Sequence, residues 1–99
     1  MFTDNKNLKQ LAPKVWVYKN FVSKEKVQEI NKIIAQNLKK LRVFNNYTLP
    51  ELANKVGVTS QQLQKYEVGK SRVSIERIEQ LAIIYNVTVS YIIEKPIEL

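Results

Sequence analysis

Apolar residues recur at intervals of three and four from Val27 to Leu41, which is the spacing that places side chains on one face of an α-helix. Ser23 stands ahead of this pattern and is a suitable N-cap, because its hydroxyl can accept a hydrogen bond from a backbone N–H of the first turn. The pattern ends at Asn45–Asn46, where the second asparagine can adopt the left-handed conformation that stops a helix. The sequence therefore predicts a long helix from Ser23 to about Phe44.

Four shorter helices are predicted after it, each beginning at a Ser or Thr. Their expected ranges are 49–56, 60–68, 75–85 and 89–94, and their expected N-caps are Thr48, Thr59, Ser74 and Thr88. Thr48 with Glu51, and Thr59 with Gln62, have the spacing of a capping box, in which two backbone N–H groups at a helix start are bonded reciprocally.

The second and third predicted helices are joined by a short turn, and the residues around it have the sizes that a helix-turn-helix requires. Ala53, Gly57 and Leu63 occur in the order Ala-x3-Gly-x5-Leu. Gly57 can take a positive φ and end the first helix, while Ala53 is small enough to let the second helix cross closely. The seam that we expect to be buried consists of Leu52, Val56, Val58, Leu63 and Tyr66. The second helix of such a unit usually enters the major groove of DNA.

The residues before Ser23 follow a different pattern. Residues 1–10 are polar, whereas Lys14–Phe21 has the β-branched and aromatic bias of a short strand. We therefore predict an all-α fold with an N-terminal extension that can hold one short strand. The expected division is an extension over residues 1–26, a helix-turn-helix domain over 27–95 and a C-terminal tail over 96–99.

Four blocks, in the correct order, resemble the Cro/C1-type (XRE-like) repressor family. They are NLKKLR at 37–42, TLPELANKVGVT at 48–59, QKYEVGK at 64–70 and SIERIEQLAIIYNVTVSYII at 74–93. The resemblance runs from about residue 34 to 93. It implies a five-helix, lambda-repressor-like domain and the function of a transcriptional repressor that binds double-stranded DNA sequence-specifically.

The resemblance also implies roles for individual side chains on and around the predicted helix 60–68. Contacts to base edges would come from Ser60, Gln61, Gln62 and Lys65. Glutamine can form a bidentate pair with adenine, and lysine prefers the acceptors of guanine. Contacts to phosphates would come from Thr48, Thr59, Gln64, Lys70, Ser71 and Arg72. The alternative is an ordinary solvated helix face followed by a basic loop.

The resemblance also implies an ion pair within the domain, and the sequence departs from the family pattern at two positions. Arg42 and Glu67 resemble a family ion pair, which would contribute only about a few tenths of a kcal/mol if it were exposed. Leu49 stands where the family usually has a phosphate-binding glutamine, and Pro50 removes a backbone N–H from the same helix start. We therefore expect the phosphate anchor either to weaken or to move to Thr48, to Lys55 or to the basic loop.

Composition favours an anionic partner and gives little support to catalysis. The 99 residues suit a single domain, and 16 basic against 9 acidic side chains leave a net charge of +7. The chain has neither Cys nor His, so we expect no metal site, no cofactor and no enzymatic activity. No apolar run reaches the roughly 18 residues of a membrane span, and residues 1–10 are too polar for a signal peptide. A cytoplasmic, nucleoid-associated protein is expected.

Two other functions stay open on the sequence. One is an antitoxin-like autorepressor whose extension binds a protein partner, and the other is an interaction module that keeps the fold with weak DNA specificity.

A homodimer is also expected, because one recognition helix covers few base pairs. Two apolar surfaces are candidates for the subunit contact, of which the extension is favoured because it is the larger aromatic surface. They consist of Val89, Tyr91, Ile92, Ile93, Ile97 and Leu99 at the end of the chain, and of Val15, Trp16, Val17, Tyr18 and Phe21 in the extension.

Overall fold

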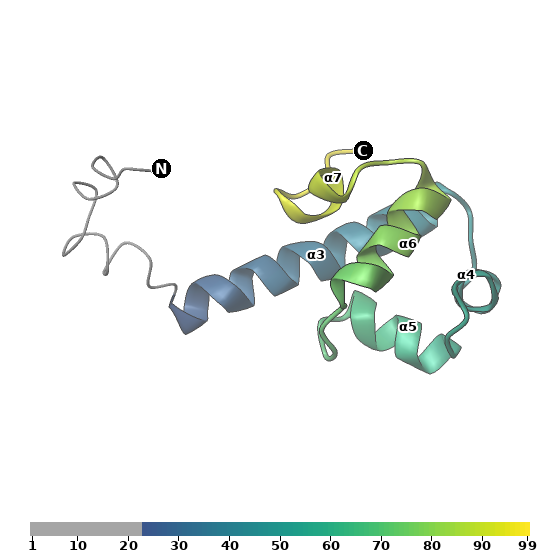
Figure 1. The fold of residues 1–99 in the computed structure, drawn as a ribbon, viewed down its shortest axis with the longest axis horizontal. Helices are drawn as coiled ribbons and strands as arrows, with labels where there is room; N and C mark the ends of the chain where they lie inside the picture. Colours follow the sequence, from purple (N-terminus) through teal and green to yellow (C-terminus); the bar gives the residue numbers. More distant parts are fainter. Residues whose placement is uncertain (1–22) are drawn as a thin grey trace, which may run out of the picture.

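Five α-helices form the regular structure of residues 23–99, the part of the chain that the computed structural model describes. They are α3 (Lys24–Phe44), α4 (Leu49–Val56), α5 (Ser60–Glu67), α6 (Ile75–Tyr85) and α7 (Val89–Ile93) (Figure 1). The prediction of an all-α, five-helix fold is confirmed. Two predicted ends are one residue too late, because Val68 and Glu94 are the C-cap residues of α5 and α7. The strand predicted at Lys14–Phe21 lies outside the described residues.

A Ser or Thr hydroxyl begins every one of these helices. In each case the side-chain oxygen accepts a hydrogen bond from the N–H three residues later, at Ser23, Thr48, Thr59, Ser74 and Thr88. Such a cap stabilises a helix by about 1 kcal/mol. The capping box predicted at Thr48 is complete, since the Thr48 N–H also donates to Glu51 Oε1 over 2.9 Å. Thr59 accepts from the Gln62 N–H, and the box predicted there is formed in that half only among the described residues.

A residue with positive φ follows each of the first four helices and turns the chain. Asn46 has φ 60° after α3, Gly57 φ 88° after α4, Gly69 φ 80° after α5 and Asn86 φ 57° after α6. A left-handed backbone is strained for residues with a bulky Cβ, and glycine and asparagine tolerate it best. The left-handed cap predicted at Asn46 is therefore confirmed, and so is the one predicted at Gly57.

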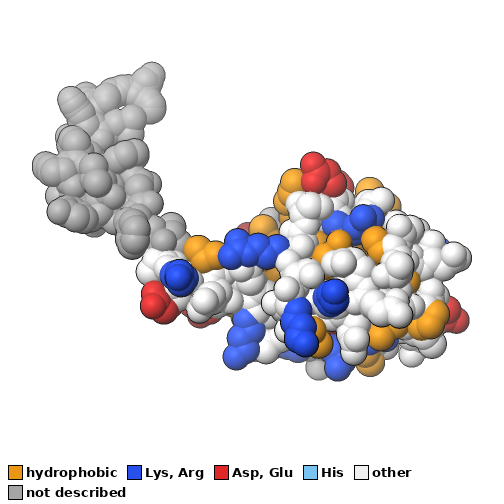
Figure 2. Space-filling model, turned by 90° about the horizontal axis from the view of Figure 1, so that it is seen from below, with side chains coloured by type: hydrophobic (Ala, Val, Ile, Leu, Met, Phe, Trp, Pro, Cys, Tyr) orange, Lys and Arg blue, Asp and Glu red, His pale blue; other side chains and the backbone are white. Residues whose placement is uncertain are grey.

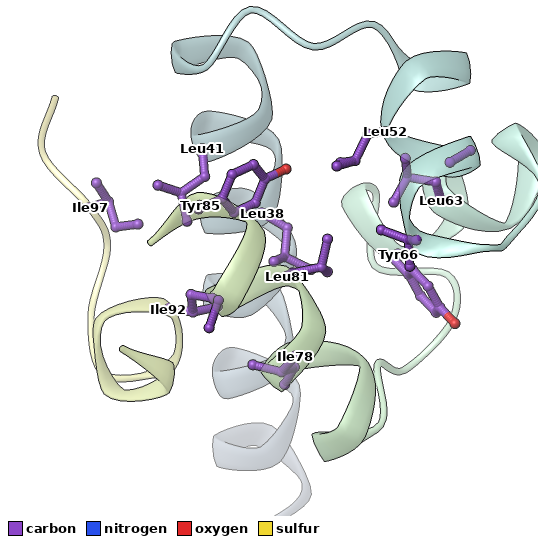
Figure 3. Close-up of a cluster of buried hydrophobic side chains, with 13 residues drawn as sticks. Leu38, Leu41, Leu52, Leu63, Tyr66, Ile78, Leu81, Tyr85, Ile92 and Ile97 are labelled. Carbon is purple, nitrogen blue, oxygen red and sulfur yellow. The ribbon is translucent and has the colours of Figure 1, made fainter. Parts of the chain in front are cut away.

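The helices pack around a single apolar core (Figure 3). α3 lies against α5 and α7, α4 against α5, and α6 against α7. Leu38 of α3 and Leu81 of α6 are almost completely buried and lie near one another at the centre of Figure 3, where side chains from several helices converge. Burying a large aliphatic side chain stabilises the fold by about 1.5–3 kcal/mol. The core therefore depends on contacts between segments far apart in the sequence.

Asn37 ties the end of the chain to α3 from a fully buried position. Its Nδ2 donates to the carbonyl oxygens of Ile92 (2.8 Å) and Lys95 (2.9 Å), and its Oδ1 accepts from the Ile97 N–H (2.9 Å). Lys40 adds a bond of 2.8 Å from its Nζ to the Ile97 carbonyl oxygen. Ile97 is buried in the core, so we propose that the domain expected over 27–95 continues through this residue.

Replacing Asn37 by Ala should destabilise the protein, because it leaves two backbone carbonyls and one N–H without their buried partner. Each such group costs about 1–3 kcal/mol, so we expect a loss of at least about 2 kcal/mol in the free energy of unfolding. Urea denaturation followed by circular dichroism measures this loss. Asn54→Ala is the matched control, because Asn54 is an exposed helical asparagine in α4. Equal stability of the two variants would contradict the role given to Asn37.

Candidate nucleic-acid interface

The outer face of α5 is polar and accessible, whereas its inner face belongs to the core. Leu63 and Tyr66 are buried, and Gln61, Gln64 and Lys65 are exposed. Positions 61, 64 and 65 are three and four residues apart, so they lie on one side of the helix. Of the residues predicted to contact bases, Gln61 and Lys65 thus share this exposed stripe. Ser60 and Gln62 are half-buried at its margin.

The turn between α4 and α5 fixes how this face is presented. The N–H groups of Gly57 and Val58 both donate to the Ala53 carbonyl oxygen, over 2.8 and 3.0 Å. Leu52, Ala53, Val56 and Leu63 are buried where the two helices meet. Val58 was predicted in the buried seam but is only partly buried, because it lies in the turn at the edge of the core.

The N-termini of α4 and α5 differ in what they offer to an anion. Thr48 and Thr59 are exposed and use their hydroxyl oxygens as acceptors, which leaves each O–H free to donate outward. Pro50 lies in the first turn of α4 and has no N–H to donate. Leu49 packs against the core, so its side chain is part of the fold and does not replace a polar phosphate ligand.

The loop after α5 carries two exposed cations beside that helix. Lys70 and Arg72 are exposed and Ser71 is half-buried. The N–H groups of Lys70 and Ser71 donate to the Lys65 carbonyl oxygen over 2.9 and 3.2 Å, which holds the loop at the end of α5. Figure 2 views the molecule from below, the side on which α5 lies, and shows Lys and Arg side chains on this face and along α3, with acidic side chains towards its edges.

A buried ion pair connects α3 to the end of α5. Arg42 Nε donates to Glu67 Oε2 over 2.8 Å, and the terminal nitrogen Nη2 donates to Glu67 Oε1 over 3.0 Å. The side chains are 12% and 3% exposed, so the weak stabilisation expected of an exposed pair does not apply. Removing one partner of a buried pair costs about 3–5 kcal/mol. The hydrogen bond to Glu67 also raises the pKa of Arg42 above its ordinary value.

The second terminal nitrogen of Arg42 continues this connection to the loop before α4. Its Nη1 donates to the Tyr47 carbonyl oxygen over 2.9 Å. The Tyr47 ring in turn contacts that of Tyr85 in α6, with 6.3 Å between the ring centres and 54° between the ring planes. Arg42 therefore fixes both the loop before α4 and the end of α5 relative to α3.

The Tyr85 hydroxyl lies in the same region and is buried without a hydrogen-bond partner among the described residues. Burial raises the pKa of Tyr85 above its ordinary value of 10.0, and the negative charge of Glu67 raises this pKa further. The ionised form is consequently favoured in the unfolded chain. The stability associated with Tyr85 is fully present below pH 10 and is lost as the pH rises above it.

Tyr85→Phe should leave the protein as stable as the wild type at neutral pH, or more stable by about 1 kcal/mol, because the deleted hydroxyl is unbonded. Above pH 10 the wild type should lose stability relative to this variant. Denaturant titrations at pH 7 and at pH 10–11 measure both effects, with Tyr91→Phe as the control at an exposed tyrosine. A loss of more than about 1 kcal/mol at neutral pH would mean that the hydroxyl has a partner.

Two other kinds of feature are absent from residues 23–99. These residues contain no group of three or more acidic, His or Cys side chains arranged to hold a metal ion. Within the same range, no helix is both long and apolar enough to cross a membrane.

The sequence of residues 38–92 matches the model of the family described as "Helix-turn-helix". The chain belongs to the helix-turn-helix family. An uncharacterized HTH-type transcriptional regulator from Sinorhizobium fredii is 32% identical over 72 residues, which are 73% of this chain and 50% of that protein. Another from Rickettsia prowazekii is 34% identical over 68 residues, 69% of this chain and 52% of that protein. The chain thus spans about half the length of these relatives.

Solved structures share the fold at lower identity. The hypothetical transcription factor NHTF from Neisseria is 22% identical and aligns over 70% of this chain and 79% of its own, with a TM-score of 0.64. The DNA-binding domain of BldD is 24% identical and aligns over 67% of this chain and 96% of its own, with a TM-score of 0.60. The predicted family and fold are confirmed, and the two sequence-distant structures bear on the fold alone.

Proposed function

We propose that this protein is a transcriptional regulator, acting as a repressor, that binds double-stranded DNA with α5 in the major groove. The observation that carries the proposal is the exposed stripe of Gln61, Gln64 and Lys65 on a helix whose other face is buried and whose end is fixed by the Arg42–Glu67 pair. Amide and ammonium groups are the chemistry that reads base edges in the major groove. The names of the relatives as transcriptional regulators support the same function.

Within this surface we propose separate roles for base contacts and phosphate contacts, and the exposure of most of these side chains supports the proposal. Base contacts are assigned to the first turns of α5, at Ser60, Gln61, Gln62 and Lys65. Phosphate contacts are assigned to the hydroxyls at the two helix starts, to one glutamine of the exposed stripe of α5 and to the following loop, at Thr48, Thr59, Gln64, Lys70, Ser71 and Arg72. Contacts of the second kind fix register and add affinity without reading sequence.

This proposal makes the protein a cytoplasmic, nucleoid-associated regulator without catalytic activity or cofactor. The net charge of +7 supports an anionic macromolecule as partner, because it attracts the phosphate backbone at long range. Sequence-selective binding distinguishes this function from that of an interaction module with the same fold.

Gln61→Ala should weaken binding to the preferred duplex by about 1–3 kcal/mol and relax the preference at one base pair. The preferred duplex is first obtained by selection from random fragments, and titrations then compare it with a scrambled duplex of the same composition. Gln80→Ala is the matched control, because Gln80 is an exposed glutamine on α6, outside the proposed surface. Equal affinity of the wild type for both duplexes would reject sequence-specific regulation.

We further propose that the protein acts as a homodimer. Of the C-terminal residues considered for the subunit contact, Ile92 and Ile97 are buried in the core of their own chain and do not belong to a free surface. Tyr91 and Leu99 remain exposed, and with Phe44 of α3 they lie around adjoining hollows of about 720 and 380 Å³. Exposed apolar patches of this kind commonly mark an interface. The extension considered as the other contact lies outside the described residues.

Phe44→Glu should shift the protein towards the monomer, because it places a charge in the proposed contact without disturbing a buried side chain. Sedimentation equilibrium of the full chain between low and high micromolar concentration measures the change. Ile83→Glu is the control, because Ile83 is an exposed isoleucine of α6 that does not line these hollows. A wild type that is monomeric throughout this range would contradict a dimer formed without DNA.

A further inference from the structure

A polar groove runs between the N-terminal half of α3 and the loop after α5, beside the helix-turn-helix. It encloses about 510 Å³. Its walls carry amide and cationic side chains from both sides: Gln28, Asn31, Lys32 and Gln36 from α3, and Lys70 and Arg72 from the loop. Nothing in the sequence pattern pointed to this groove, because α3 and the loop are far apart along the chain.

Close packing of the loop on α3 gives the groove its floor. A Cβ atom placed on Gly69 would lie 3.9 Å from the Cβ of Ala35, so the loop backbone passes directly over a small, buried residue of α3. Gly69 has φ 80°, which turns the chain at this point. The loop therefore passes close to α3 at Gly69, and this approach forms the floor of the groove.

The charges in the groove favour an anion. Within residues 23–99 the ion pairs are Lys26 with Glu29 and Arg42 with Glu67, so Lys32, Lys70 and Arg72 are available to a ligand. Glu67 also lines the groove, but its carboxylate is 3% exposed and is neutralised by Arg42. Three cations with neighbouring amide donors match a chain of phosphodiesters better than they match a neutral ligand.

We propose that this groove binds the sugar-phosphate backbone of the same duplex that α5 reads, and that Lys32 contributes a phosphate contact there. The inference rests on the proposed function. It extends the DNA-contacting surface to residues that precede the family match, which begins at residue 38. The helix rises about 10 Å between Gln28 and Ala35, which is enough for the DNA strand to continue past Lys70 and Arg72. The contact adds affinity without sequence preference.

Lys32→Ala should flatten the dependence of log K on log salt by about 0.9, the value expected for one lost phosphate contact. The same change should appear on the preferred and on the scrambled duplex. Lys26→Ala is the matched control, because it removes one charge from another face of α3 and should leave the slope unchanged. Lys70→Ala provides the reference for a phosphate contact in the loop. Circular dichroism confirms that each variant is folded.

Phosphate-ethylation interference locates the contact directly. For the wild type, ethylation of a phosphate outside the stretch contacted by α5 and the loop should interfere with binding. This interference should disappear in Lys32→Ala. An unchanged salt slope in Lys32→Ala together with a reduced one in Lys70→Ala would overturn the groove and leave the proposed function intact. Equal changes in Lys32→Ala and Lys26→Ala would also overturn it, because general attraction would explain both. A wild type that binds no duplex would overturn both proposals.

Discussion

Glu67 lies at the last turn of α5 with almost no contact with solvent, and an isolated carboxylate in that position would be strongly unfavourable. The fork of Arg42 supplies two hydrogen bonds to it, and the remaining nitrogen of that guanidinium reaches the carbonyl of Tyr47. Neither charge can leave the other without a large loss of free energy. The position of α5 relative to α3 is therefore set by an interaction that has one geometry. Because the exposed glutamines and lysine stand on α5, the same interaction fixes their position relative to the rest of the domain.

Residues that act locally made the helices predictable from the sequence. The caps at Ser23, Thr48 and Ser74 and the left-handed Asn46 and Gly57 act within a few residues of where they stand, so their effect can be read without knowing the fold. The exposure of Gln61 and Lys65 followed from the position of Leu63 on the opposite face of the same helix.

Interactions across the fold could not be predicted in the same way. Asn37 binds groups 55–60 residues away, and Arg42 meets Glu67 across 25 residues, so neither the burial of Asn37 nor that of the ion pair has a local signature. The apolar end of the chain was interpreted as one surface, whereas the fold divides it into buried Ile92 and Ile97 and exposed Tyr91 and Leu99. Which apolar residue is inside depends on where α3 passes, and composition does not contain that information.

The four left-handed junctions also bear on how far such a sequence can diverge. Each junction requires only a residue that tolerates positive φ, and each helix start requires only a small side chain with an oxygen acceptor. Several residue types meet each requirement, so most exposed positions are free to change while the chain still reverses at the same points. Mutational drift would therefore remove identity much faster than it removes topology. The same fold at 22–24% identity is the expected result.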